Sequence, residues 1–206
     1  MSISIVIPAY NESRRIGKVI QSVSQYADEV LVIDDGSIDN TVNTAKEKGA
    51  VVIQQKHSGY LTTLKRGLSE AKNNIIITMD ADGEHCASYI PSLISPIMSG
   101  NADLVMGIRS KVPRISERFI TRLVNLKVKT GDACTGFRAI KKDLALRLKL
   151  NGVCTCGTLI LESNFLEAKS VDVLIDTLPV DKPRKISWYH IKQVFYVISW
   201  LIKLSN

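Results

Sequence analysis

Hydrophobic and polar positions follow two different periods along the first half of the chain. Short β-branched apolar runs predict strands at residues 2–8, 29–33, 51–54, 74–79 and 103–107. Between these runs, apolar residues recur at helical spacing and predict helices at residues 16–23, 41–48, 61–71 and 90–98. Strands that alternate with helices predict an α/β fold with a mostly parallel sheet flanked by helices.

The second half is less regular. Its pattern predicts helices at residues 116–127, 141–148, 158–168 and 188–204, a short strand at 136–140 and an edge strand at 171–178. The segment 179–184 is the one candidate hinge. We therefore expect one domain over residues 1–180 and a C-terminal helical segment, amphipathic or apolar, over residues 181–206.

Polar clusters follow three of the predicted strands, at residues 8–12, 34–39 and 80–84. Ligands of parallel sheets bind outside the carboxyl ends of the strands. Asp80 and Asp82, two residues apart in an extended chain, would face the same way and suit Mg²⁺ or Mn²⁺, with Glu84 as a third oxygen donor. Two aspartates in a plain turn are the alternative, and the same alternative applies to Asp34-Asp35-Gly36-Ser37.

The charge is uneven. The formal net charge is +7. Residues 1–107 carry 9 basic and 12 acidic side chains, whereas residues 108–206 carry 18 and 8. A solvated basic surface is one interpretation, and contact with phosphate, nucleic acid or an acidic membrane is the other. Nucleic-acid binding is disfavoured because Phe119 is the one aromatic residue between 108 and 135.

The C-terminal segment suggests a membrane surface. The apolar run at residues 194–202 is too short to span a bilayer, but Lys182, Arg184 and Lys185 precede Trp188-Tyr189. A helix that packs on the domain, or that joins two subunits of a homo-oligomer, is the alternative. The N-terminus has no basic flank, so we expect no signal peptide and a cytoplasmic location.

The four cysteines, Cys86, Cys134, Cys154 and Cys156, include no C-x-x-C pair. They are expected to be reduced thiols. Cys154-x-Cys156 lacks a second pair of ligands in the nearby sequence, which favours structural thiols over a zinc site. His190 is expected in a surface or loop position.

Three blocks resemble those of family-2 glycosyltransferases with the GT-A fold: Ile5-Val6-Ile7-Pro8-Ala9-Tyr10-Asn11-Glu12, Val32-Ile33-Asp34-Asp35-Gly36-Ser37 and Met79-Asp80-Ala81-Asp82-Gly83. The second half is similar to the dolichyl-phosphate mannose synthase, or polyprenyl-phosphate glycosyltransferase, branch. That similarity rests on residues 103–109, on Arg118, Arg122 and Asn125, and on Thr135-Gly136-Phe137-Arg138-Ala139.

The resemblance implies roles for individual residues. The nucleotide sugar would lie against six residues: Pro8, Tyr10, Glu12, Asp35, Asp80 and Ala81. The metal would be held by Asp80, Asp82 and Glu84. Asp82, Arg109 and Arg138 would be catalytic, and the acceptor phosphate would meet Arg118, Arg122 and Arg138. Arginine suits this task because guanidinium binds phosphate oxygens in a fork and stays charged.

Three positions depart from the family pattern. Lys56-His57-Ser58-Gly59-Tyr60 stands where Gly-Lys-Gly is usual, Glu84 stands where this branch commonly has Gln, and Cys86 replaces a usual Asp. The first of these changes the loop expected to contact the donor.

The resulting prediction is an inverting, Mg²⁺- or Mn²⁺-dependent hexosyltransferase. It would move mannose, or next glucose, from GDP-mannose or UDP-glucose to a dolichyl or polyprenyl phosphate at the cytoplasmic face of a membrane. Two alternatives stay open. One is transfer to a glycan hydroxyl, for which Asp132 would be the candidate base. The other is a non-catalytic membrane-surface protein on a decayed transferase fold.

Overall fold

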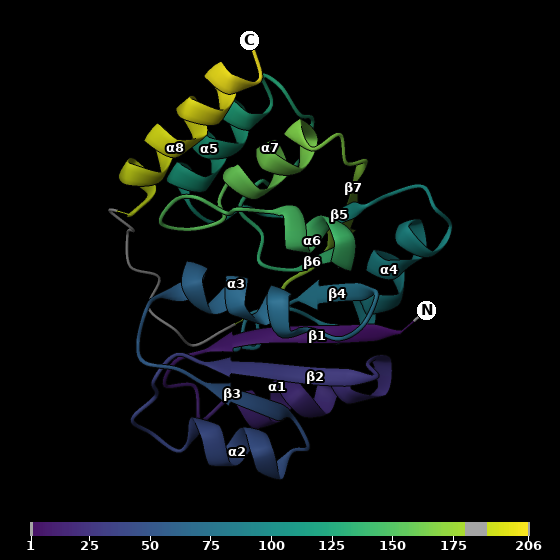
Figure 1. Cartoon of the computed structure of the whole chain (residues 1–206), viewed down its shortest axis with the longest axis vertical. Helices are drawn as coiled ribbons and strands as arrows, with labels where there is room; N and C mark the ends of the chain where they lie inside the picture. The colour runs from purple at the N-terminus through teal and green to yellow at the C-terminus, as the bar shows by residue number, and fades with distance from the viewer. Residues whose placement is uncertain (1, 180–188, 206) are drawn as a thin grey trace.

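A computed structural model describes residues 2–179 and 189–205. One seven-stranded sheet runs through the molecule in the order β3-β2-β1-β4-β6-β5-β7 (Figure 1). The strands are β1 (Ile3–Ala9), β2 (Glu29–Asp34), β3 (Val51–Gln54), β4 (Ile75–Thr78), β5 (Leu104–Arg109), β6 (Arg138–Lys141) and β7 (Ser170–Ile175). All neighbours pair in parallel except β6, which is antiparallel to β4 and β5. The mostly parallel sheet and the edge position of β7 are as predicted.

Helices cover both faces of the sheet because side chains alternate along each strand. Ile5 and Ile7 of β1 face the cluster with α1 (Ile16–Val23), α2 (Thr41–Glu47) and α4 (Ile90–Met98). Val6 faces the opposite cluster. The helices of that second cluster are α3 (Tyr60–Glu70), α5 (Ile115–Val124), α6 (Lys142–Arg147), α7 (Thr158–Phe165) and α8 (Tyr189–Lys203).

The elements of the second half are shorter than their sequence pattern predicts. The helix α7 ends at Phe165, and Glu167 then takes a left-handed conformation with φ of 61° that closes the helix. The strand β7 ends at Ile175, after which Thr177 forms an isolated bridge with His85. The bridge ties the end of β7 to the acidic segment that follows β4.

The C-terminal helix α8 packs against α5 and α7 at the end of the molecule away from β3 (Figure 1). His190, Gln193 and Val197 are its buried residues. Packing on the domain, one of the alternatives above, therefore holds for this helix. The candidate hinge after Pro179, together with Lys182, Arg184, Lys185 and Trp188, lies outside the described residues. No helix in the described part of the chain is long and apolar enough to cross a bilayer.

Candidate active site

The polar clusters that follow β1, β2 and β4 meet at one edge of the sheet, as predicted. The two loops after β1 and β2 are joined: the backbone N–H of Asn11 donates to Ser37 Oγ at 2.8 Å, and Ile38 N–H donates to Asn11 Oδ1 at 2.9 Å. Asn11 adopts a φ of 55°, a conformation that asparagine tolerates better than most residues. These bonds set the relative position of the first two blocks.

Asp35 is buried, and the segment 55–59 surrounds its carboxylate. Backbone N–H groups of Ser58 and Gly59 each donate to it at 2.9 Å, as does the Gln55 amide. Burial alone would raise the pKa of Asp35, but the hydrogen bonds from Gln55, Ser58 and Gly59 lower it below its usual value. The segment 55–59 therefore favours the ionised form of Asp35.

A cavity of about 580 Å³ opens beside the end of β4. One part of its wall is acidic and contains Asp80, Asp82 and Glu84; another is basic and contains Arg109, Arg114 and Arg138. A cavity with carboxylates and guanidinium groups on its walls can accommodate a ligand that carries both a cation and phosphate groups.

Asp80 lies in a crowded part of the cavity wall. Gly136 leaves space for it, because a Cβ at that position would collide with the Asp80 carboxylate. The Nε2 of His85 lies 4.0 Å from Asp80 Oδ2, and the His85 ring stacks on Phe137. Burial raises the pKa of Asp80, His85 and Arg138 act in the opposite direction, and the charges of Asp82 and Glu84 raise it further. A cation would compensate this accumulation of negative charge.

The acidic wall suits a divalent cation that is shared with a ligand. Mg²⁺ and Mn²⁺ prefer carboxylate and phosphate oxygens and are often held by one or two carboxylates plus substrate phosphates. Among the residues that the structure describes, Asp80, Asp82 and Glu84 do not form a set of three ligands that converge within 4.8 Å. The residues fit a cation that takes part of its shell from bound phosphates, and the assignment of Asp80, Asp82 and Glu84 as its ligands stays a prediction.

Arg138 is the most unusual group at the cavity. It is buried, with 1% of its surface exposed, and its Nη2 donates to Thr155 Oγ1 at 2.9 Å. Among the described residues, its Nε and Nη1 have no hydrogen-bond partner. A buried guanidinium with unpaired donors is costly unless an anion satisfies it. The free donors of Arg138 can therefore bind an anion such as a phosphate group.

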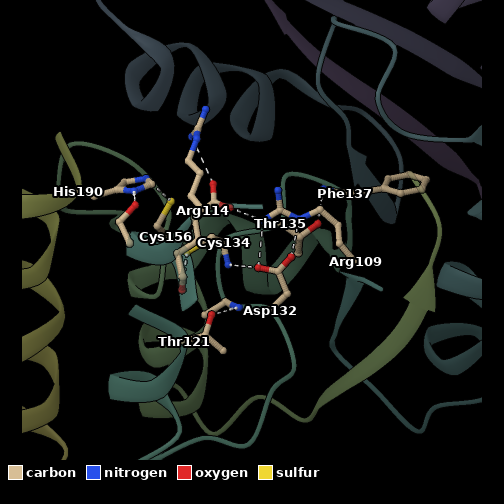
Figure 2. A network of polar contacts seen from close by, with 12 residues as sticks. Arg109, Arg114, Thr121, Asp132, Cys134, Thr135, Phe137, Cys156 and His190 are labelled. Atoms are coloured by element: carbon tan, nitrogen blue, oxygen red, sulfur yellow. Dashed lines mark hydrogen bonds and ion pairs between the residues drawn. The ribbon is translucent and has the colours of Figure 1, made fainter. Parts of the chain in front are cut away.

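Arg109 lies in a different environment, inside a network of ion pairs (Figure 2). Its Nε and Nη2 bind both oxygens of Asp132 at 2.6 and 3.2 Å, and Nη2 also binds Glu117 at 3.1 Å. Burial alone would lower the pKa of Arg109, but the bonds to Asp132 raise it. Glu117 also pairs with Arg114. The charge of Arg109 is thus balanced within the protein, and its predicted catalytic role stays a prediction.

A family model described as glycosyl transferase family 2 matches residues 4–161. This span covers more than half of the chain. The chain belongs to glycosyl transferase family 2. The resemblance seen in the three sequence blocks is therefore confirmed.

Relatives of this glycosyltransferase include enzymes named for dolichyl phosphate acceptors. A UDP-N-acetylglucosamine–dolichyl-phosphate N-acetylglucosaminyltransferase of Methanococcus voltae is 29% identical, with 83% of this chain and 84% of the relative covered. A dolichol-phosphate mannosyltransferase of Pyrococcus furiosus is 27% identical, and the match covers 74% of this chain but only half of that protein.

The fold resembles that of glucosyl-3-phosphoglycerate synthase from Mycobacterium tuberculosis, solved with Mn²⁺, UDP-glucose and phosphoglyceric acid. The TM-score is 0.84 at 23% identity, and the match covers 97% of this chain and 79% of the other. This likeness confirms the GT-A fold.

Several residues predicted for the site of the glycosyltransferase lie outside the cavity lining. Arg118 and Arg122 are exposed on α5. The nucleotide-site candidates that do not line this cavity are Pro8, Tyr10, Glu12, Asp35 and Ala81, which lie at or just beyond the carboxyl ends of β1, β2 and β4. Their roles toward the donor stay predictions.

Other lining residues were missed from the sequence. Arg114 immediately precedes α5 and lines the cavity, and its Nε is buried without a partner among the described residues. Cys134, Cys154, Cys156 and His190 also line it. The expectation of a surface or loop position for His190 is wrong: this residue is buried in α8. No sequence spacing would have indicated that these residues lie together, because they come from four separate segments of the chain.

Proposed function

We propose that this glycosyltransferase moves a hexose from a nucleotide diphosphate sugar to a polyprenyl or dolichyl phosphate, with inversion at the sugar carbon. Mannose is the first candidate sugar and glucose the second. The observation that supports this proposal most concerns buried Arg138, whose Nε and Nη1 have no partner in the described part of the chain, in a cavity whose wall also contains Asp80 and Asp82.

The acceptor chemistry fits the groups that are present. A hydroxyl acceptor needs a base to remove its proton, whereas a phosphate acceptor is already ionised at neutral pH. Asp132, the candidate base, is fully buried and bound through both oxygens to Arg109. It is not placed to receive a proton from a sugar hydroxyl. A phosphate acceptor instead needs cations, and Arg114 and Arg138 supply them at the cavity.

The residues of the acidic wall would orient the donor. Asp80 and Asp82 would hold a Mg²⁺ or Mn²⁺ ion, which when bound neutralises charge on the departing nucleoside diphosphate. Asp82 Oδ1 accepts the backbone N–H of Glu84 at 3.1 Å, and His85 stabilises the position of Asp80. The bond from Glu84 orients the Asp82 carboxylate before any ligand arrives, which reduces the reorganisation needed for transfer.

A lipid acceptor also requires contact with a membrane, and the outer faces of α8 and α5 suit such contact. Ile191, Phe195, Ile198 and Ile202 recur at helical spacing on α8 and are all exposed. On α5, Ile115 and Phe119 are exposed beside the cations Arg118 and Arg122. Apolar side chains together with arginines favour an anionic lipid surface. We therefore assign Arg118 and Arg122 to lipid headgroups rather than to the acceptor phosphate inside the cavity.

Replacing Phe195 by glutamate should weaken binding to anionic vesicles by roughly tenfold or more, because it places a charge in the apolar stripe of α8. Vesicle co-sedimentation measures this effect. Met98→Glu is the matched control, since Met98 is half exposed at the end of α4 on the opposite layer. Equal binding of wild-type protein and the Phe195 variant would exclude this surface as the membrane contact.

The proposed reaction can be tested with radiolabelled GDP-mannose, UDP-glucose and UDP-N-acetylglucosamine, each offered separately with a polyprenyl phosphate in detergent, with and without Mn²⁺. We expect metal-dependent label in the organic phase from one donor. Metal-dependent donor hydrolysis without lipid labelling would contradict the proposed acceptor. Neither binding nor turnover of any of these sugar nucleotides would favour the non-catalytic alternative.

A further inference from the structure

Three chemically soft ligands converge next to the cavity, apart from the acidic wall. The ligand atoms of Cys154, Cys156 and His190 all lie within 4.8 Å of one another. Among the residues that the structure describes, no other group of three or more histidine, cysteine or acidic side chains meets this condition. We propose that this group binds a Zn²⁺ ion, a site separate from the Mg²⁺ or Mn²⁺ of the acidic wall.

The side chains of this group indicate which metal ion it would bind. Two thiolates and an imidazole nitrogen are the ligands that Zn²⁺ prefers, whereas Mg²⁺ and Mn²⁺ prefer oxygen. Two thiolates also neutralise the charge of the ion, which a largely buried site requires. Cys134 lines the same cavity but lies outside this group of three, so the fourth position of a tetrahedral ion is left to a water molecule or to a movement of Cys134.

The orientation of His190 fits this assignment. Its Nε2 lies 3.7 Å from Cys156 Sγ, and its Nδ1 lies 2.7 Å from the hydroxyl of Ser116 on α5 (Figure 2). A histidine that binds a metal through Nε2 carries its proton on Nδ1, and a hydrogen-bond acceptor there fixes the ring. The hydroxyl oxygen of Ser116 can accept a hydrogen bond from Nδ1–H, which directs Nε2 toward the thiols.

The cysteine loop is held in place as well. The amide of Gln193, fully buried in α8, accepts N–H bonds from Val153 and Cys154 and donates to the carbonyl of Cys156 at 2.9 Å. The N–H of Cys156 points at Cys154 Sγ at 3.4 Å. These contacts preorganise the two thiols around a common point before a metal binds, as a metal site requires.

The position of the site indicates what the ion does. The cysteines lie between α6 and α7, whereas His190 belongs to α8, which follows residues outside the described part of the chain. An ion shared by both segments would fasten α8 to the cavity wall. We therefore infer a structural zinc that fixes the side of the cavity bearing Thr155, the partner of Arg138.

The test uses the full chain purified with reduced thiols. Elemental analysis should find about one zinc per chain. After chelation, Co²⁺ titration should give sulfur-to-cobalt charge-transfer bands in the near ultraviolet, which a carboxylate site does not produce. Cys156→Ser and His190→Gln should each abolish the tight binding. Ser116→Ala should weaken Co²⁺ affinity by about 10- to 100-fold.

Two matched variants separate this site from its surroundings. Cys86→Ser removes a cysteine outside the cluster, and Asp82→Asn alters the acidic wall; both should keep the charge-transfer bands. The proposal is overturned if reduced wild-type protein shows neither zinc nor these bands, if Cys156→Ser retains them, or if Cys154 and Cys156 prove to be joined in a disulfide. The test depends first on the spectrum of the wild-type protein, so poor folding of one variant does not invalidate it. The metal spectrum is also independent of sugar transfer, so a failure of the proposed reaction would not affect the result.

Discussion

Arg138→Met is expected to lower kcat by on the order of 10²- to 10³-fold. The substitution removes a cation whose Nε and Nη1 have no partner among the described residues and would bind a phosphate of the substrate. The same change should leave thermal stability unchanged or raise it. Methionine fills much of the same volume without a buried guanidinium, and the interactions lost are the hydrogen bond to Thr155 and the electrostatic attraction to Asp80. Loss of activity with retained or improved stability is the outcome that a purely structural arginine would not produce.

The comparison for this variant is Arg147→Met. Arg147 ends α6, bonds weakly to the carbonyl of Leu166 at 3.5 Å, and does not line the cavity. It should retain wild-type kcat. Steady-state transfer rates and melting curves of both proteins measure the effect. A drop in stability of the Arg138 variant without a fall in kcat would contradict the phosphate-binding role.

Asp82→Asn is expected to reduce turnover by at least about 10²-fold and to raise the Mn²⁺ concentration needed for half-maximal rate. Asparagine keeps a side-chain oxygen that can accept the N–H of Glu84, so the loop should retain its conformation. Only the negative charge is lost. The rate measured over a Mn²⁺ titration separates a metal defect from a general one, because a general defect would lower the rate without shifting the midpoint.

Asp176→Asn provides the control. Asp176 is exposed, accepts a hydrogen bond from the Tyr89 hydroxyl at 3.2 Å, and does not line the cavity. It should behave as wild type in both rate and Mn²⁺ midpoint. If Asp82→Asn does the same, Asp82 does not hold the metal and the assignment of the acidic wall is wrong.

The acidic part of the site was predictable from the sequence because it depends on topology. Parallel strands bring their carboxyl ends to one edge, so the residues after β1, β2 and β4 had to lie near each other once the strands were recognised. The proposed roles of Asp80 and Asp82 depend on that position. The mostly parallel character of the sheet was predictable because strands alternate with helices, but the strand order and the antiparallel β6 were not predicted.

The basic part was less predictable because it depends on packing. Arg118 and Arg122 share one face of α5, and nothing in their spacing says whether that face meets the cavity or the solvent. Packing of α5 against α8 leaves both side chains exposed, while Arg114, just before the helix, lines the cavity. Likewise, the pairing of Arg109 with Asp132, 23 residues away, is a tertiary contact that sequence pattern does not encode.

The measurement that tests the central claim most directly compares a polyprenyl phosphate with the polyprenol of the same chain length as acceptors, with the preferred donor and Mn²⁺. The arginines at the cavity and the inaccessible Asp132 predict sugar transfer to the phosphate and essentially none to the alcohol. Equal or faster transfer to the alcohol would contradict the account, because the enzyme would then need a base that we do not assign.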